Sequence, residues 1–233
     1  MPLLDMLTAA GPLLWILILL SIFVVYQIVY RIQVLAKLDP NVKLLQTQVH
    51  AALMQNNLSG AVDVAARADQ PSGNVMRAGL ERYPAGRDAS QAAMQDATML
   101  EEDRVYQGIN TLGMIAQIAP LLGLLGTVIG MVRSFLVFAQ TTAPTPTQLS
   151  TGISEALINT AGGLVVAIVA YVGRQIVRNK ADAVMLQVDR SRESLSSWLE
   201  EFRLRQKGVL TGVPLGSYEP ERKVTKPSKV TQA

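Results

Sequence analysis

The sequence predicts an all-α membrane protein with three transmembrane helices and long cytoplasmic helical extensions. Three apolar runs carry this prediction, at 12–31, 112–138 and 153–174, because each provides the roughly 20 apolar residues with which a helix crosses about 30 Å of hydrocarbon. The 233 residues are 49% hydrophobic, yet most charged residues lie between or after these runs. The chain therefore divides into membrane spans and charged segments instead of forming one soluble domain.

The first apolar run follows an N-terminal segment, residues 1–11, that contains Asp5 and neither Lys nor Arg. A secretory signal peptide would have a basic start, a shorter apolar core and a small-residue cleavage site. Because these features are missing, we interpret 12–31 as an uncleaved transmembrane helix. Trp15 near its start and Tyr26 near its end suit the aromatic belts at the two membrane surfaces.

Basic residues predict the orientation of the spans. They are missing from 1–11 and from the loop at 139–152. They follow the first and third spans, as Arg31, Lys37, Lys43, Arg174, Arg178 and Lys180. The positive-inside rule therefore places the N-terminus and the loop outside and the remaining charged segments in the cytoplasm, an N-out/C-in topology.

Residues 32–111 are expected to form a cytoplasmic helical domain, since apolar residues recur there at helical spacing. Breaks between its helices are predicted at Asn56-Asn57, Pro71-Ser72-Gly73 and Tyr83-Pro84-Ala85-Gly86. We expect Asp88 to cap a last helix that continues through Leu112 straight into the second span.

The third span is expected to begin before the membrane and to continue beyond it. Thr145, Pro146 and Gln148 fit a capped helix start. Beyond the membrane, residues 175–207 should continue as a cytoplasmic helix whose broad apolar face packs on the first cytoplasmic block. Residues 208–233, rich in Pro, Gly and scattered Lys, are expected to be a disordered basic tail.

Small residues punctuate the second and third spans at positions where another helix can approach closely. They are Gly123, Gly126 and Gly130 in the second span and Gly162 and Gly163 in the third. Because glycine lowers helix propensity, close helix packing explains this density better than chance. The alternative is that membrane helices simply tolerate glycine.

The polar residues inside these two spans are few. Thr127 and Thr160 are expected at similar depths, within roughly 6 Å at 1.5 Å per residue. A lone buried threonine often only bonds its own i−4 carbonyl, so two at matched depth leave a structural role and a polar pathway both open. Glu155 is expected near one mouth of such a pathway, the alternative being a solvated residue near a helix N-terminus.

Ionisable residues are missing from the middle of every apolar run: no Asp, Glu, Lys or His lies there. Proton or ion transfer through hydrocarbon normally needs such a side chain facing the bundle interior. If this protein conducts, a partner must therefore supply the carboxylate. A self-sufficient transporter is disfavoured for the same reason, and because the three spans show no inverted repeat.

Enzyme, metal and nucleic-acid functions are not predicted, and no cofactor is expected. The chain has no Cys and one His, His50, so neither a Cys/His metal site nor a nucleophile, base and orienter set can be assembled. The stretch Gly123 to Gly130 superficially resembles a phosphate-binding loop, but it lies within an apolar run and no Lys-Ser/Thr follows it. Membrane topology already accounts for the basic charge.

Two stretches of the membrane part carry a family resemblance. Ala119 to Met131, APLLGLLGTVIGM, followed by Phe135, is similar to the first signature of the ExbB/TolQ group of bacterial inner-membrane proton-channel subunits, relatives of flagellar MotA. The segments Gly152 to Leu157 (GISEAL), Thr160-Ala161 and Gly163 to Ile168 (GLVVAI) resemble its second signature. The resemblance covers roughly residues 10–180.

The resemblance implies a homopentamer around two transmembrane helices of an ExbD/TolR-type one-span partner, whose membrane aspartate carries protons. By position, Thr127 and Thr160 match the family's pore-lining threonines, and Glu155 matches its glutamate near the periplasmic entrance. Such a complex uses proton-motive force to act on a periplasm-spanning protein, TonB or TolA. We expect the ExbB-like role in TonB-dependent transport; the alternatives are a TolQ-like role in envelope integrity or a non-conducting membrane scaffold.

Two positions depart from the family pattern. Val169 stands where a Pro often follows Ala-Ile, which puts a kink in the third helix in doubt. Tyr30 precedes Arg31 where many members have Glu, so an ion pair at that cytoplasmic boundary is also in doubt.

Overall fold

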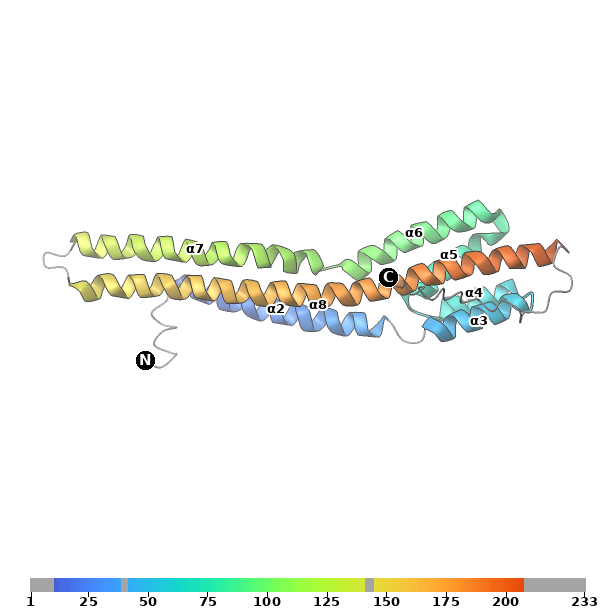
Figure 1. The fold of residues 1–233 in the computed structure, drawn as a ribbon, viewed down its shortest axis with the longest axis horizontal. Coiled ribbons are helices and arrows are strands. Elements are labelled where there is room, and N and C mark those ends of the chain that lie inside the picture. The colour runs from blue at the N-terminus through green and yellow to red at the C-terminus, as the bar shows by residue number, and fades with distance from the viewer. Residues whose placement is uncertain (1–10, 39–41, 141–144, 208–233) are drawn as a thin grey trace, which may run out of the picture.

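The structure is a computed structural model that describes residues 11–38, 42–140 and 145–207. These residues form a long rod of helices (Figure 1). In chain order the elements are α2 (Gly11–Lys37), α3 (Val42–Met54), α4 (Leu58–Arg67), α5 (Pro71–Arg82), η1 (Tyr83–Ala85), α6 (Arg87–Tyr106), α7 (Ile109–Gln140) and α8 (Pro146–Gln206). One half of the rod consists of α2, α7 and the first part of α8. The other half consists of α3 to α6 around the rest of α8.

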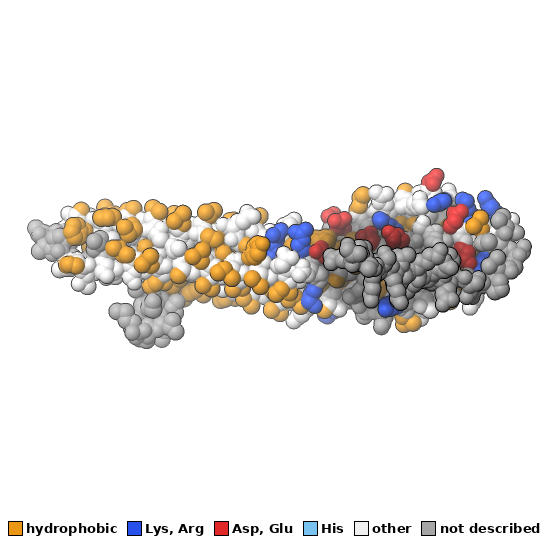
Figure 2. All heavy atoms as spheres, in the orientation of Figure 1, with side chains coloured by type: hydrophobic (Ala, Val, Ile, Leu, Met, Phe, Trp, Pro, Cys, Tyr) orange, Lys and Arg blue, Asp and Glu red, His pale blue; other side chains and the backbone are white. Residues whose placement is uncertain are grey.

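Three helical stretches among the described residues are long and apolar enough to cross a bilayer, and they include α2, α7 and most of α8. Apolar side chains gather over this half of the surface, whereas charged side chains gather over the half that contains α3 to α6 (Figure 2). Exposed residues such as Leu19, Leu121 and Ile168 would be a liability in water and are suited to lipid. The predicted fold class, an all-α membrane protein with three spans, is confirmed. The N-out/C-in orientation stays a prediction.

Helix α8 organises the fold because it runs through both halves without interruption for 61 residues. It begins at Pro146, in the position that the sequence suggested for the first helical residue, and continues through Val169. In its second part Val188, Leu195 and Phe202 are buried against apolar side chains of α3, α5 and α6. Fully burying a side chain of this kind contributes about 1.5–3 kcal/mol, so this core fixes the second half of the rod.

Local sequence signals explain the short helices. Asn57 is the N-cap of α4 and accepts a hydrogen bond from the Gly60 N–H at 2.8 Å. Pro71 begins α5. The turn predicted after Arg82 is η1, and Gly86 follows it with a φ of +112°, a conformation that favours glycine. The expected cap at Asp88 is wrong, because α6 already begins at Arg87 with Gly86 as its N-cap.

The predicted continuous helix from Asp88 into the membrane is also wrong. Helix α6 ends at Tyr106 and α7 begins at Ile109, with Gly108 between them at a φ of +78°. Gly108 lies beside the Arg31 side chain, and Arg31 donates hydrogen bonds to the carbonyls of Val105 at 2.6 Å and Arg104 at 3.1 Å. In an unbroken helix the N–H groups of residues 108 and 109 would bond these carbonyls. Arg31, only 5% exposed, therefore supplies donors at the end of α6.

The same joint between α6 and α7 is tied to α8. The Tyr106 hydroxyl donates a hydrogen bond to the Asp182 carboxylate at 2.5 Å. This hydrogen bond, together with partial desolvation and the negative charge of Asp182, raises the Tyr106 pKa to about 12 from its ordinary value of 10.0. Tyr106 lies outside the apolar spans, so it is accessible to titration.

We expect Tyr106 to ionise above the pH at which an ordinary tyrosine does. Because its pKa is raised in the folded state, the stabilisation from the link to Asp182 is fully present below pH 10.0 and is lost as the pH rises through about 12. A spectrophotometric titration of tyrosinate checks this prediction. The chain has 6 tyrosines, so the difference between the wild type and Tyr106→Phe isolates this group, and an ordinary pKa in that difference would contradict it.

Parts of the predicted organisation lie outside the described residues. These are most of the N-terminal segment (1–10), residues 141–144 of the loop at 139–152, and the tail at 208–233. The helix expected over 175–207 ends at Gln206, one residue before the predicted boundary.

Candidate functional site

The candidate site lies along the contact between α7 and α8, which we call the seam. The two helices run side by side and antiparallel (Figure 1). At Gly163, an added Cβ would lie 2.6 Å from the Ala119 carbonyl oxygen and 2.9 Å from the Gly123 Cα. At Gly130, it would lie 3.1 Å from the Gly152 carbonyl oxygen. The backbones therefore touch, which only residues without a side chain permit.

The other two glycines of the predicted packing set also contact α2. A Cβ at Gly126 would lie 3.0 Å from Leu13 as well as against Asn159 of α8, at 2.5 Å. A Cβ at Gly162 would meet only Leu14 and Leu17, at 3.5 and 3.6 Å. The glycines thus define two contacts, one between α7 and α8 and one towards α2.

Thr127 and Thr160 come together at one level of the seam. The Thr160 hydroxyl donates across the seam to the Gly123 carbonyl at 3.1 Å, and the Thr127 hydroxyl donates to the Leu124 carbonyl of its own helix at 2.7 Å. Because the two acceptors belong to consecutive residues, the hydroxyls lie at nearly the same depth. Each hydroxyl oxygen still has lone pairs with which to accept a further proton or hydrogen bond.

The two threonines also lie on the same flank of the seam, away from α2. Helical residues are about 100° apart. Thr127 is therefore turned by one such step from Gly126, which faces Leu13, and Thr160 is turned by about 160° from Gly162, which faces Leu14. Both threonines are partly exposed, so this flank presents hydroxyl groups to whatever packs against it.

Glu155 is not brought next to the threonines. It precedes Thr160 by five residues, which places it about 7.5 Å further along α8 and about 140° around it. Its side chain is 10% exposed and forms an ion pair with Arg133 of α7, with 3.3 Å between the Arg133 Nη1 and the Glu155 Oε1. This pair lies at the outer end of the seam, on the α2 side.

The pairing of Arg133 with Glu155 was not predicted from the sequence. The signal was available: Arg133 lies six residues beyond Thr127 and Glu155 five residues before Thr160, so opposite charges stand at one depth on antiparallel helices. Asn159, which adjoins Thr160 in the sequence, is 2% exposed in the seam. Ser134, which was not singled out, donates to the Gly130 carbonyl at 3.0 Å.

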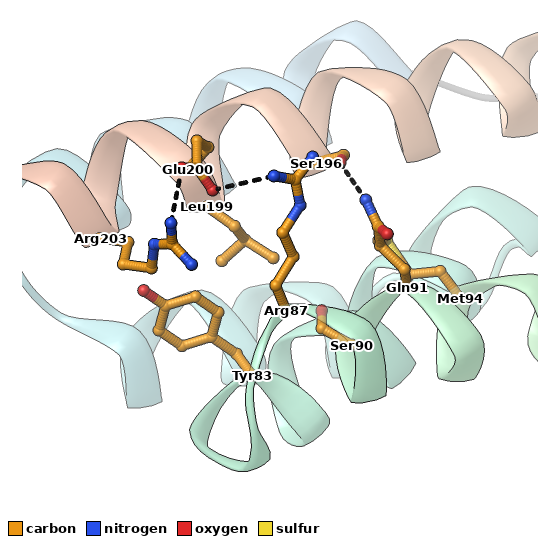
Figure 3. Close-up of a pocket in the computed structure, with 9 residues that line it drawn as sticks. All are labelled: Tyr83, Arg87, Ser90, Gln91, Met94, Ser196, Leu199, Glu200 and Arg203. Carbon is orange, nitrogen blue, oxygen red and sulfur yellow. Dashed lines mark hydrogen bonds and ion pairs between the residues drawn. The ribbon is translucent and has the colours of Figure 1, made fainter.

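A second polar site braces the other half of the rod (Figure 3). Glu200 of α8 pairs with Arg87 of α6 at 3.7 Å and with Arg203 at 3.0 Å. The space between these residues is about 10 Å³, room for about one water molecule. The Tyr83 ring lies at the edge of this cavity, and burial raises the pKa of its hydroxyl. This site suits a structural brace better than a ligand pocket.

Within the described ranges, no group of three or more His, Cys, Asp or Glu side chains is arranged to hold a metal ion. The chemistry of the candidate site therefore rests on the two hydroxyls, the Asn159 amide and the Arg133–Glu155 ion pair.

Comparison with known proteins places this seam in a family. The model of the MotA/TolQ/ExbB proton channel family matches residues 67–190, a range that contains all of α7 and the membrane part of α8. The chain belongs to this family. The resemblance seen in the sequence is thereby confirmed, and the relatives below carry the ExbB and TolQ names within it.

Several curated relatives of the ExbB/TolQ type are similar to this chain. The biopolymer transport protein exbB1 of Vibrio cholerae is 34% identical over 144 residues, which are 60% of this chain and 63% of that protein. ExbB of Salmonella typhimurium is 44% identical over 80 residues, 32% of this chain and 33% of that protein. TolQ of Pseudomonas aeruginosa, a Tol-Pal system protein, is 38% identical over 80 residues, 34% of this chain and 35% of that protein. The chain thus spans less than two thirds of these relatives.

Proposed function

We propose that this chain is a proton-channel subunit of an inner-membrane motor that works with an ExbD/TolR-type one-span partner. One observation carries the proposal: Thr127 and Thr160, from two helices of a proton-channel family member, present their hydroxyls at one depth on one flank of the seam. That arrangement gives a proton carrier on a neighbouring helix two adjacent polar contacts within hydrocarbon.

The partner's role follows from what the two spans lack. No carboxylate lies near the middle of the apolar runs 112–138 and 153–174, so the group that takes up and releases protons comes from the partner's membrane aspartate. The threonines accept hydrogen bonds from that carboxyl or from water beside it, while their own hydroxyls continue to donate to the carbonyls of Gly123 and Leu124. Glu155, at the outer end of the seam, suits the entrance of the pathway rather than its middle. The chain itself has no catalytic role in this proposal.

The assembly and its cargo are also proposals. Five copies surround two partner helices in the bacterial inner membrane, with the N-terminus and the loop at 139–152 in the periplasm and the extensions at 32–111 and 175–207 in the cytoplasm. The motor energises TonB-dependent transport across the outer membrane. The similar ExbB proteins support this choice, and the similarity to a TolQ protein makes envelope integrity the second candidate. Native mass spectrometry with and without the partner tests the proposed assembly. Five copies with partner helices support the motor, and a monomer that does not bind the partner supports a scaffold.

Replacing Thr127 or Thr160 by valine is expected to reduce partner-dependent proton flux by about 100-fold, the lower end of what a positioned proton-transfer group contributes. Valine keeps the shape of the side chain and removes the hydroxyl. A pH-sensitive dye enclosed in liposomes that contain the chain and its partner measures the flux.

Two control variants separate a pathway role from a packing role. Serine at either position keeps the hydroxyl and should keep most of the flux. Thr151→Val removes an exposed hydroxyl that bonds within α8, to the Thr147 carbonyl, and should change nothing. Wild-type flux in both valine variants would argue against the threonine pathway.

A further inference from the structure

The ion pair between Arg133 and Glu155 closes the outer end of the seam. Its two side chains come from different helices, and they differ sharply in exposure: 54% for Arg133 and 10% for Glu155. The carboxylate is thus the buried member, and the guanidinium reaches it from a largely accessible position.

The helices next to this pair are in backbone contact. A Cβ added to Gly152 would collide with the Ser134 hydroxyl, and one added to Gly130 would lie 3.1 Å from the Ala156 Cβ. Ser134 itself donates to the Gly130 carbonyl at 3.0 Å. Such close packing leaves the Glu155 carboxylate little room to move along the seam, so its environment is set by the charge beside it.

The chemistry of the two groups makes the pair asymmetric. Arginine stays charged at every pH at which the protein works, whereas a buried carboxylate that loses its cation must take up a proton or move to water. Arg133 is therefore the residue that lets an ionised carboxylate remain at this position. Because the Arg133 side chain is largely exposed, replacing it leaves no large cavity in the packing of the seam.

The ion pair also lies on one defined side of the seam. Arg133 lies six residues beyond Thr127, about 120° around α7, and Glu155 lies about 140° around α8 from Thr160. Both charged groups are thus turned to the α2 side, opposite the flank on which the threonines present their hydroxyls.

We propose that Arg133 is a positioning residue that holds Glu155 on the α2 side of the seam and compensates its buried charge, so that the motor requires this carboxylate to be paired or absent and does not use it as a proton carrier. This inference rests on the proposed function, because it assigns a role within that proton pathway. It deepens that function by giving the outer end of the seam an electrostatic latch between α7 and α8.

Four variants test the latch through proton flux in liposomes that contain the full chain and its partner. Arg133→Lys keeps the cation and should retain flux within about threefold of wild type. Arg133→Gln leaves a buried carboxylate without its cation and should lose flux by about tenfold or more. Glu155→Gln still accepts a hydrogen bond from Arg133 and should lose less than Arg133→Gln. The double variant Arg133→Gln/Glu155→Gln removes the stranded charge and should recover flux towards that of Glu155→Gln.

The order of these effects decides between the latch and a proton-carrying carboxylate. If Glu155 carried protons, Glu155→Gln would be the most damaging single change and the double variant would stay inactive; that result would overturn the proposal. Equal flux in Arg133→Gln and wild type would overturn it as well.

A second readout reports the seam directly and does not depend on transport. The chain has no cysteine, so the pair Gly130→Cys/Ala156→Cys has no competing thiol. The 3.1 Å between the Cβ positions is slightly shorter than the roughly 3.5–4.5 Å of a disulfide, so a small outward shift of the two helices brings the thiols to bonding geometry. Oxidation should cross-link this pair rapidly with Arg133 present, slowly with Arg133→Gln, and rapidly again with the double Gln change. An unchanged rate in Arg133→Gln would contradict the latch. If wild-type liposomes pass no protons, the proposed function fails, and the cross-linking still tests the latch.

Discussion

Gly163→Ala is expected to separate α7 from α8 and to reduce the stability of the fold strongly. The new Cβ would lie 2.6 Å from the Ala119 carbonyl oxygen and 2.9 Å from the Gly123 Cα. Both are backbone atoms, so no side-chain rotation relieves the overlap, and the helices must move apart. We expect a loss of about 3 kcal/mol, the upper end of the usual cost of overpacking, measured by denaturation in detergent.

The neighbouring glycine provides a matched control. A Cβ at Gly162 would make ordinary contacts of 3.5 and 3.6 Å with the side chains of Leu14 and Leu17. Gly162→Ala should therefore be neutral or stabilising by up to about 1 kcal/mol, because alanine has the higher helix propensity. Equal stability of the two variants would mean that the seam is looser than the structure shows.

Arg31→Met is expected to loosen the joint between α6 and α7. The change keeps a long side chain and removes the donors to the carbonyls of Arg104 and Val105. A buried acceptor left without a donor costs about 1–3 kcal/mol, so two of them put the expected loss at about 2–6 kcal/mol. Faster hydrogen–deuterium exchange over residues 105–112 would show that the loss is local to the joint.

A surface arginine serves as the control for that experiment. Arg77 pairs with Glu81 one turn away on α5, and both side chains are about half exposed. Exposed pairs of this kind contribute about 1 kcal/mol or less, so Arg77→Met should leave exchange at the joint unchanged. If Arg31→Met exchanged at the wild-type rate there, the two hydrogen bonds would have no part in holding the joint.

The features that could be predicted from the sequence depend on local patterns. Three apolar runs were sufficient to predict three spans, and counting residues from the loop placed Thr127 and Thr160 near one depth. The features that were missed depend on contacts between distant segments. The break at Gly108 interrupts an otherwise helical pattern, and its stabilising donor, Arg31, lies more than 70 residues earlier.

The sequence also did not reveal which neighbouring helix each residue of the membrane helices faces. Gly126 and Gly162 were assigned to helix packing, but a sequence does not say which neighbour a small residue faces: Gly162 faces α2, whereas Gly126 contacts both α8 and α2. Likewise, Arg133 and Glu155 share a depth that the sequence contains, while their meeting on the side opposite the threonines depends on how α7 and α8 are rotated against each other.

The contrast between an uninterrupted α8 and a divided α6–α7 has a mechanical consequence. At 1.5 Å per residue, the 61 residues of α8 form a shaft about 90 Å long, so a twist applied beside Thr160 reaches the far end of the rod within one hydrogen-bonded element. The neighbouring α6–α7 segment is interrupted at Gly108, so the same twist would bend it there. If the proposed motor generates torque in the bilayer, that torque would leave the membrane along the single helix α8, and the neighbouring α6–α7 segment would bend at its joint.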